Sequence, residues 1–145
     1  MTYTTAIWLG GGASAFVMAT IWLNVRGRRR ERHLLQIRGA QDAKSFAAMF
    51  AAEAEQAVAT ALYPRLQRIT YTHAVPFTKD DTFRALDFDA EDLLDEVMAI
   101  FGDLGSNTPT SRELSQELTG VSTVGELVAA LARLRMRDAA ANSAT

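Results

Sequence analysis

Residues 80–105, DDTFRALDFDAEDLLDEVMAIFGDLG, give the clearest indication of the fold class. Apolar side chains recur in it at spacings of three and four, the period of one helix face, at Leu93, Leu94, Val97, Met98, Phe101 and Leu104. Gly102 and Gly105 then predict where this helix ends. Between Asp80 and Asp103, nine carboxylates stand against Arg84 alone. The sequence therefore predicts an amphipathic helix whose outer face is strongly acidic.

Helical spacing continues on the N-terminal side of this stretch. From Ser45 onward the apolar positions again recur every three or four residues, at Phe46, Met49, Phe50, Ala57, Val58, Ala61, Leu62, Leu66 and Ile69. Pro64 interrupts that pattern. Because proline lacks an amide donor, we expect a kink near Thr60 or a new helix that begins just before Arg65. Residues 71–81, which include Pro76, are expected to form a loop.

Helical spacing also continues on the C-terminal side. Residues 111–118 predict a short helix, and Thr123 with Glu126 forms a capping box that opens a last helix through Leu134. We find no alternating strand pattern. The sequence thus predicts an all-α domain over residues 45–137, followed by a flexible tail over residues 138–145.

The N-terminal part is different in kind. Residues 6–23 carry no charge, and extending the run to Thr4 and Val25 adds only weakly polar ends. As a helix this run would be roughly 27 to 33 Å long, which matches a hydrocarbon core of about 30 Å. Tyr3, Trp8 and Trp22 lie near the ends of this run, where aromatic rings favour the headgroup level. We therefore expect a transmembrane anchor over residues 1–25. Small residues spaced four apart allow two such helices to approach closely and form a homodimer. These residues are Gly10 and Ser14, and Gly11, Ala15 and Ala19.

Arginines follow the apolar run directly and set its orientation. Because basic flanks stay on the cytoplasmic side, we expect a single-pass protein of the cell (inner) membrane, with the N-terminus outside and the C-terminal domain in the cytoplasm. Residues 26–44 are predicted to form a basic juxtamembrane connector. Two arrangements are open for it: a continuation of the transmembrane helix, or a separate segment. Its side chains expected at lipid headgroups are Arg26, Arg28, Arg29, Arg30 and Arg32.

Charge and composition exclude several classes of function. Residues 1–38 carry six arginines and one glutamate, a charge of +5, so with a total of −2 the remaining residues carry −7. An acidic body repels phosphates, so we expect no nucleic-acid partner. Residues 111–128 also fit a DNA-binding helix-turn-helix poorly, because Gly120 comes five residues after Ser115 instead of four. The chain has no cysteine. His33 and His73 are isolated, so no metal, cofactor or catalytic site is expected.

Two motifs carry a family resemblance. Residues 80–105 resemble the approach to the Asp-Ser-Leu motif and recognition helix of acyl carrier proteins, and TVGELVAAL, residues 123–131, resembles the opening of the last helix of that family. The resemblance spans about residues 57–137 and implies an acyl-carrier-like four-helix bundle. Carried over by position, Asp89 matches the motif aspartate, Ala90 stands where the family has the serine that bears phosphopantetheine, and Glu91 replaces the leucine.

This departure determines the functional prediction. Alanine has no hydroxyl to form the phosphodiester, so the attachment position is degenerate. We therefore expect a non-catalytic, membrane-tethered interaction module or accessory subunit whose acidic helix docks a protein with a basic patch, through Asp89, Glu91, Asp92, Asp95 and Glu96. The alternative is a membrane-anchored acyl carrier modified at an unconventional serine such as Ser106 or Ser111.

Overall fold

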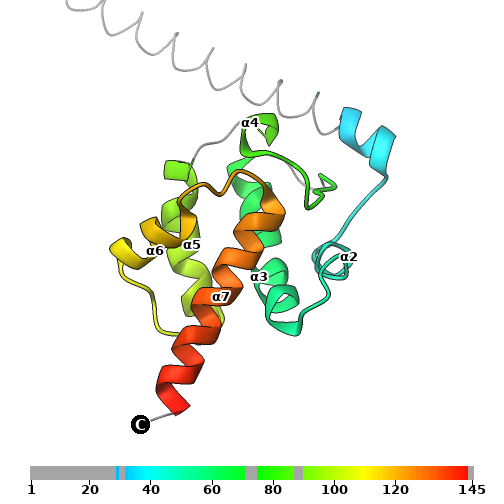
Figure 1. Ribbon diagram of the computed structural model, residues 1–145. Coiled ribbons are helices and arrows are strands. Elements are labelled where there is room, and N and C mark those ends of the chain that lie inside the picture. Colours follow the sequence, from blue (N-terminus) through cyan, green and yellow to red (C-terminus); the bar gives the residue numbers. More distant parts are fainter. Residues whose placement is uncertain (1–28, 30–31, 71–74, 87–89, 144–145) are drawn as a thin grey trace, which may run out of the picture.

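The computed structural model describes residues 29, 32–70, 75–86 and 90–143, without the side chains of residues 90–92. Over these residues the protein is all-α, as predicted, and the one β feature among them is an isolated bridge between Thr82 and Thr123. Residues 32–38 are helical. The labelled helices in Figure 1 are α2 (Ala43–Ala47), α3 (Glu53–Ile69), α4 (Phe83–Leu86), α5 (Ala90–Asp103), α6 (Ser111–Leu118) and α7 (Val124–Ser143).

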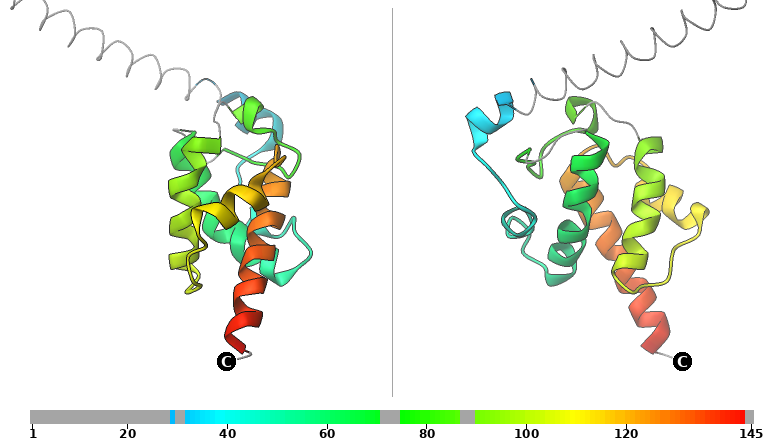
Figure 2. Two further views of the ribbon diagram at one scale, coloured as in Figure 1. Left: turned by 60° about the vertical axis from the view of Figure 1, so that its left-hand side comes forward. Right: turned by 180° about the vertical axis from the view of Figure 1, so that it is seen from behind.

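Helix α3 is the centre of the bundle. It packs against α2, α5 and α7, while α6 packs against α7. The core side chains between them are fully buried, among them Leu62, Leu66, Val97, Phe101 and Leu127. Helix 32–38 and α4 lie at one end of the molecule, and the C-terminal end of α7 lies at the other in all three views (Figures 1 and 2).

An aromatic cluster holds the short helix α2 and the segment before α4 against α3. The ring centroids of Phe46 and Tyr63 are 5.6 Å apart, and those of Tyr63 and Phe77 are 5.8 Å apart. Phe50 meets Phe46 edge to face at 5.5 Å. Asp42 caps α2 by accepting a 2.7 Å hydrogen bond from the Ser45 amide, so the folded body begins before the predicted boundary at residue 45.

Pro64 does not break its helix. The expectation of a new helix before Arg65 is wrong, because α3 runs unbroken from Glu53 to Ile69. The carbonyl that Pro64 deprives of a donor is that of Thr60, and both residues are exposed, so water can satisfy it. Buried Leu62 and Leu66 on either side of the proline fix the helix to the core.

Helix α5 confirms the predicted amphipathic helix with two differences. Gly102 lies inside it, and the helix ends in a Schellman motif, with Gly105 at φ +63° and the Ser106 amide donating to Phe101 at 2.9 Å. Leu94, assigned to the apolar stripe, is exposed, whereas Ile100 is fully buried. The buried face is therefore rotated slightly from the predicted one.

The last two helices begin as the sequence indicates. Helix α6 has the predicted bounds, and Thr123 and Glu126 form the predicted capping box, with reciprocal hydrogen bonds of 3.1 and 3.2 Å. The flexible tail predicted over residues 138–145 is helical as far as Ser143, where α7 ends. Asp138 accepts hydrogen bonds from the Asn107 backbone and side chain at 3.0 and 2.7 Å. Helical structure thus extends past the predicted domain end at residue 137.

The predicted transmembrane run, residues 6–23, lies outside the described residues, as do the small residues of the proposed homodimer face. Within the part of the chain that the structure describes, none of the helices combines the length and the apolar character that crossing a bilayer needs.

Candidate functional site

Four of the five residues of the predicted docking surface lie on α5. Asp89 falls outside the described residues, and Glu91 and Asp92 belong to α5 with side chains that are not described. Asp95 is exposed, whereas Glu96 is half-buried. The structure therefore separates two neighbours that the sequence placed in one surface.

Glu96 points toward α3 and forms ion pairs there. Its carboxylate accepts from Arg65 at 2.7 Å and from Arg68 at 3.0 Å. Arg65 also pairs with Asp103 at the end of α5, and only 13% of the Arg65 side chain is exposed. These contacts join α3 to α5, so Glu96 and Asp103 are engaged within the protein. Sequence reasoning missed Arg65 and Arg68, which lie one turn apart on α3.

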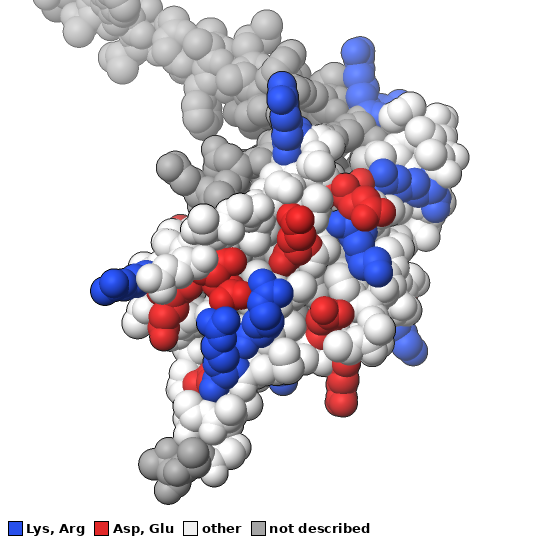
Figure 3. Space-filling view, in the orientation of Figure 1, with Lys and Arg blue, Asp and Glu red and all other residues white. Residues whose placement is uncertain are grey.

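Next to Asp95, the exposed side of α5 is partly apolar. Leu94 is 36% exposed, Ala99 is exposed and Met98 is half-buried against the core. An acidic side chain beside accessible apolar atoms combines charge, which steers a partner, with area that a partner can bury. On the face of the body shown in Figure 3, acidic and basic side chains are interspersed, so charge there does not form one uniform patch.

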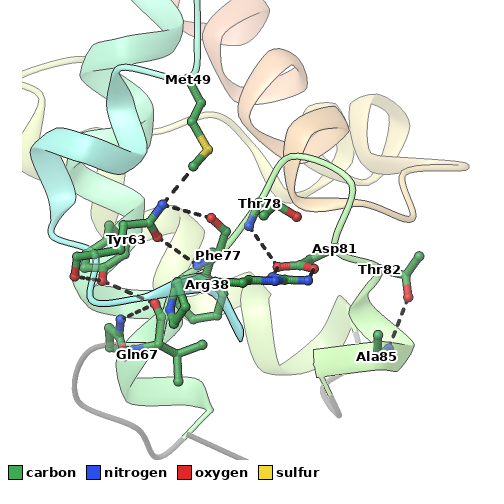
Figure 4. Close-up of polar contacts among 12 residues, drawn as sticks. Arg38, Met49, Tyr63, Gln67, Phe77, Thr78, Asp81, Thr82 and Ala85 are labelled. Atoms are coloured by element: carbon green, nitrogen blue, oxygen red, sulfur yellow. Dashed lines mark hydrogen bonds and ion pairs between the residues drawn. The ribbon is translucent and has the colours of Figure 1, made fainter. Parts of the chain in front are cut away.

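A second polar cluster joins helix 32–38 to the body (Figure 4). Arg38, the last residue of that helix, donates to both carboxylate oxygens of Asp81 at 2.7 and 2.9 Å and to the Pro76 carbonyl at 3.1 Å. Asp81 also accepts from the Thr78 amide at 2.8 Å. Gly39 follows at φ +77°, a left-handed conformation that suits glycine, and ends the helix.

The ionised Asp81 side chain is stabilised although it is mostly buried. Burial by itself would raise the pKa of this carboxyl, but the hydrogen bonds from Arg38 and Thr78 outweigh burial and hold the pKa below its ordinary value. The charge of Arg38 is favoured by the same contact. The pair is therefore ionised across the neutral range, and it fixes the connector to the body.

Two glutamines form hydrogen bonds to the backbone of residues 75–77, in the segment that precedes Asp81. Gln41 accepts from the Phe77 amide at 2.8 Å and donates to the Phe77 carbonyl at 3.0 Å. Gln67 makes the same two-way contact with Val75, at 3.0 and 3.1 Å. The Tyr63 hydroxyl donates to the Gln41 carbonyl at 2.6 Å. This polar cluster, Arg38, Gln41, Tyr63, Gln67 and Asp81, is called the junction below.

The remaining predicted residues are placed as follows. Ala90, the degenerate attachment position, is the first residue of α5. Ser106 is half-buried just after α5, and Ser111 is exposed at the start of α6. Among the predicted lipid contacts, Arg29 and Arg32 are exposed, while Arg26, Arg28 and Arg30 lie outside the described residues.

Hydrogen bonds within the protein account for the buried polar atoms of the described residues. Within the described residues, each buried side-chain nitrogen or oxygen has a hydrogen-bond partner, and His, Asp and Glu side chains do not group in threes as a metal site needs. An open groove of about 670 Å³ between α2 and α3 is lined by three alanines, Ala47, Ala48 and Ala57, and by four polar residues, Lys44, Glu53, Gln56 and Thr60. The described part of the chain thus offers exposed surfaces and a hydrogen-bonded joint between helix 32–38 and the body.

Comparison with known proteins adds no assignment, since no family model, no curated protein and no solved structure matches the chain.

Proposed function

We propose that this protein is a membrane-tethered, non-catalytic interaction module whose acidic helix α5 docks a basic patch on a partner protein. The observation that carries the proposal is the division of acidic groups on α5. Glu96 and Asp103 are bound by arginines of α3, whereas Asp95 is exposed beside Leu94. Asp95, with Glu91 and Asp92 in the preceding turn, forms the proposed docking surface.

The body is proposed to be a degenerate acyl-carrier-like bundle. The order of a first long helix, an acidic helix, a short helix and a capped last helix supports this, as do the two motifs at residues 80–105 and 123–131. At the attachment position Ala90 lacks a hydroxyl, which argues for docking without a prosthetic arm. The tether rests on the uncharged run at residues 6–23 and the arginines that follow it.

A charge reversal with a matched control tests the docking surface. Full-length protein is purified from detergent-solubilised membranes as wild type, as Asp95→Lys and as Asp80→Lys, a reversal of another exposed carboxylate. Since electrostatics sets encounter rate and specificity, Asp95→Lys should lower capture of a specific partner about tenfold and Asp80→Lys much less. Equal recovery of every partner with Asp95→Lys and wild type would remove the proposal.

Intact mass distinguishes the module from a carrier. The proposal expects the bare polypeptide mass for protein purified from its own membranes. A phosphopantetheine adduct, lost on Ser106→Ala or Ser111→Ala, would contradict it in favour of an acyl carrier that uses an unconventional serine.

A further inference from the structure

Helix 32–38 has one face that packs on the body and another that nothing in the described chain covers. Leu34 and Leu35 are half-buried, and Leu34 packs against the core. Arg38 reaches Asp81 from the same side. On the opposite side Arg32, His33, Gln36 and Ile37 are all exposed, and they form a contiguous face because their offsets are one, four and five residues. This set is called the outer face below.

Ile37 is the most exposed of the large hydrophobic residues that stand out on the described surface, at 66%. An isoleucine on the same exposed face as Arg32, and close in sequence to Arg29, combines an apolar group with cations, as interfacial helices do at an anionic lipid surface. Phosphate headgroups complement the arginines, and the headgroup boundary accepts the aliphatic side chain. The outer face also follows shortly after the predicted span.

We propose that the outer face of helix 32–38 lies in the headgroup layer of an anionic bilayer. This proposal rests on the proposed tether and goes beyond it, because the junction then fixes the orientation of the whole body relative to the membrane. The first turn of α5 begins toward the same end of the molecule and carries Glu91 and Asp92, which anionic lipid repels (Figure 1). Anionic lipid therefore favours contact with helix 32–38 over contact with the acidic start of α5.

Single-cysteine spin labels test this directly, because the chain has no cysteine of its own. Full-length Ile37→Cys, Gln36→Cys, Met136→Cys and Ser14→Cys are labelled and reconstituted in phosphatidylcholine vesicles with and without phosphatidylglycerol. Met136 is the matched control, since it is 53% exposed near the far end of α7. Collisions with a water-soluble relaxation reagent and with oxygen report the depth of each label.

In anionic vesicles the labels at 36 and 37 should be shielded from the water-soluble reagent, and the label at 136 should not. Replacing Arg32 by Gln should reduce the ratio of seated to unseated protein about fivefold, the equivalent of about 1 kcal/mol per basic residue. Arg112→Gln, an exposed arginine on α6, should leave it unchanged.

Labels at 36 and 37 that are as accessible as the label at 136 would overturn the inference, while a label at 14 in hydrocarbon would leave the tether standing. A label at 14 in water would overturn the tether and the inference together. Equal shielding in pure phosphatidylcholine would overturn the anionic-lipid assignment. Spin–spin broadening at 37 would instead assign the outer face to a second copy.

Discussion

Gly125 allows the turn before α4 to lie directly on the start of α7. Its amide donates to the Lys79 carbonyl at 2.8 Å, and the Val124 amide donates to the Asp81 carbonyl at 2.9 Å. A Cβ atom at position 125 would lie 2.9 Å from that same Lys79 oxygen, a backbone atom that cannot move aside by itself. Close backbone approach, rather than an unusual φ angle, is what requires glycine here.

Gly125→Ala should therefore destabilise the fold by about 1 to 3 kcal/mol, because the turn at 79–81 must move away from α7. Gly102→Ala is the matched control, since an added Cβ meets nothing within 4 Å in α5 and alanine favours the helix by about 0.5 to 1 kcal/mol. Urea unfolding of the full-length chain in micelles, followed by circular dichroism, measures both. If both substitutions changed the free energy of unfolding by the same amount and in the same direction, the close backbone approach at Gly125 would not be the cause of the destabilisation.

Asp81 predicts a pH dependence of stability. Its pKa is lowered in the folded state, so its contribution is complete above the ordinary value of 3.8 and is lost as the pH falls through the lowered value. Asp81→Asn should cost about 1 to 3 kcal/mol at neutral pH, because Arg38 loses its partner. The free energy of unfolding should then fall less steeply in acid than for wild type. Parallel curves would contradict the role of the pair.

At the scale of elements, the arginines of α3 decide which acidic groups of α5 remain available. Arg65 and Glu96 have side chains only 13% and 19% exposed, so water screens their attraction less than that of surface pairs. The pairs fix the relative position of two helices whose apolar faces already pack. They also leave Asp95 outside, one residue before Glu96.

A double-mutant cycle on Arg65→Gln and Glu96→Gln tests this link. Each single change should destabilise by about 1 to 2 kcal/mol, and the double mutant should be more stable than the sum predicts by about 1 kcal/mol. Asp95→Asn, on the exposed side, should stay within about 0.5 kcal/mol of wild type. Additive single effects would mean that the two side chains are not coupled.

Local patterns predict the helices well and the joints between them poorly. Thr123 with Glu126 and the bounds of α6 follow from residues a few positions apart, which is the range that capping and helical periodicity act over. The Arg38–Asp81 and Arg65–Glu96 pairs join residues 43 and 31 positions apart, so they depend on the tertiary packing. The continuation of α3 through Pro64 has the same origin, because burial of Leu62 and Leu66 overrides a local breaker. Asp95 was predicted correctly as acidic helix surface, but its separation from Glu96 was not.

At the scale of the whole molecule, charge is divided along the chain. Residues 1–38 carry +5 and the remainder −7, and the partly buried ion pair of Arg38 with Asp81 joins the two parts at the boundary. An anionic membrane attracts the first part and repels the second. The proposed tether, which holds the acidic body near the bilayer, accounts for both charges.

Topology in intact cells tests this account most directly. Thr2→Cys and Asn142→Cys are expressed as full-length protein and exposed to a membrane-impermeant maleimide, then the membranes are washed with alkaline carbonate. The account predicts that the chain stays with the washed membranes, that Cys introduced at position 2 is labelled from outside, and that Cys introduced at position 142 is labelled only after permeabilisation. Recovery of the chain in the carbonate wash, or labelling of position 142 from outside intact cells, would contradict it.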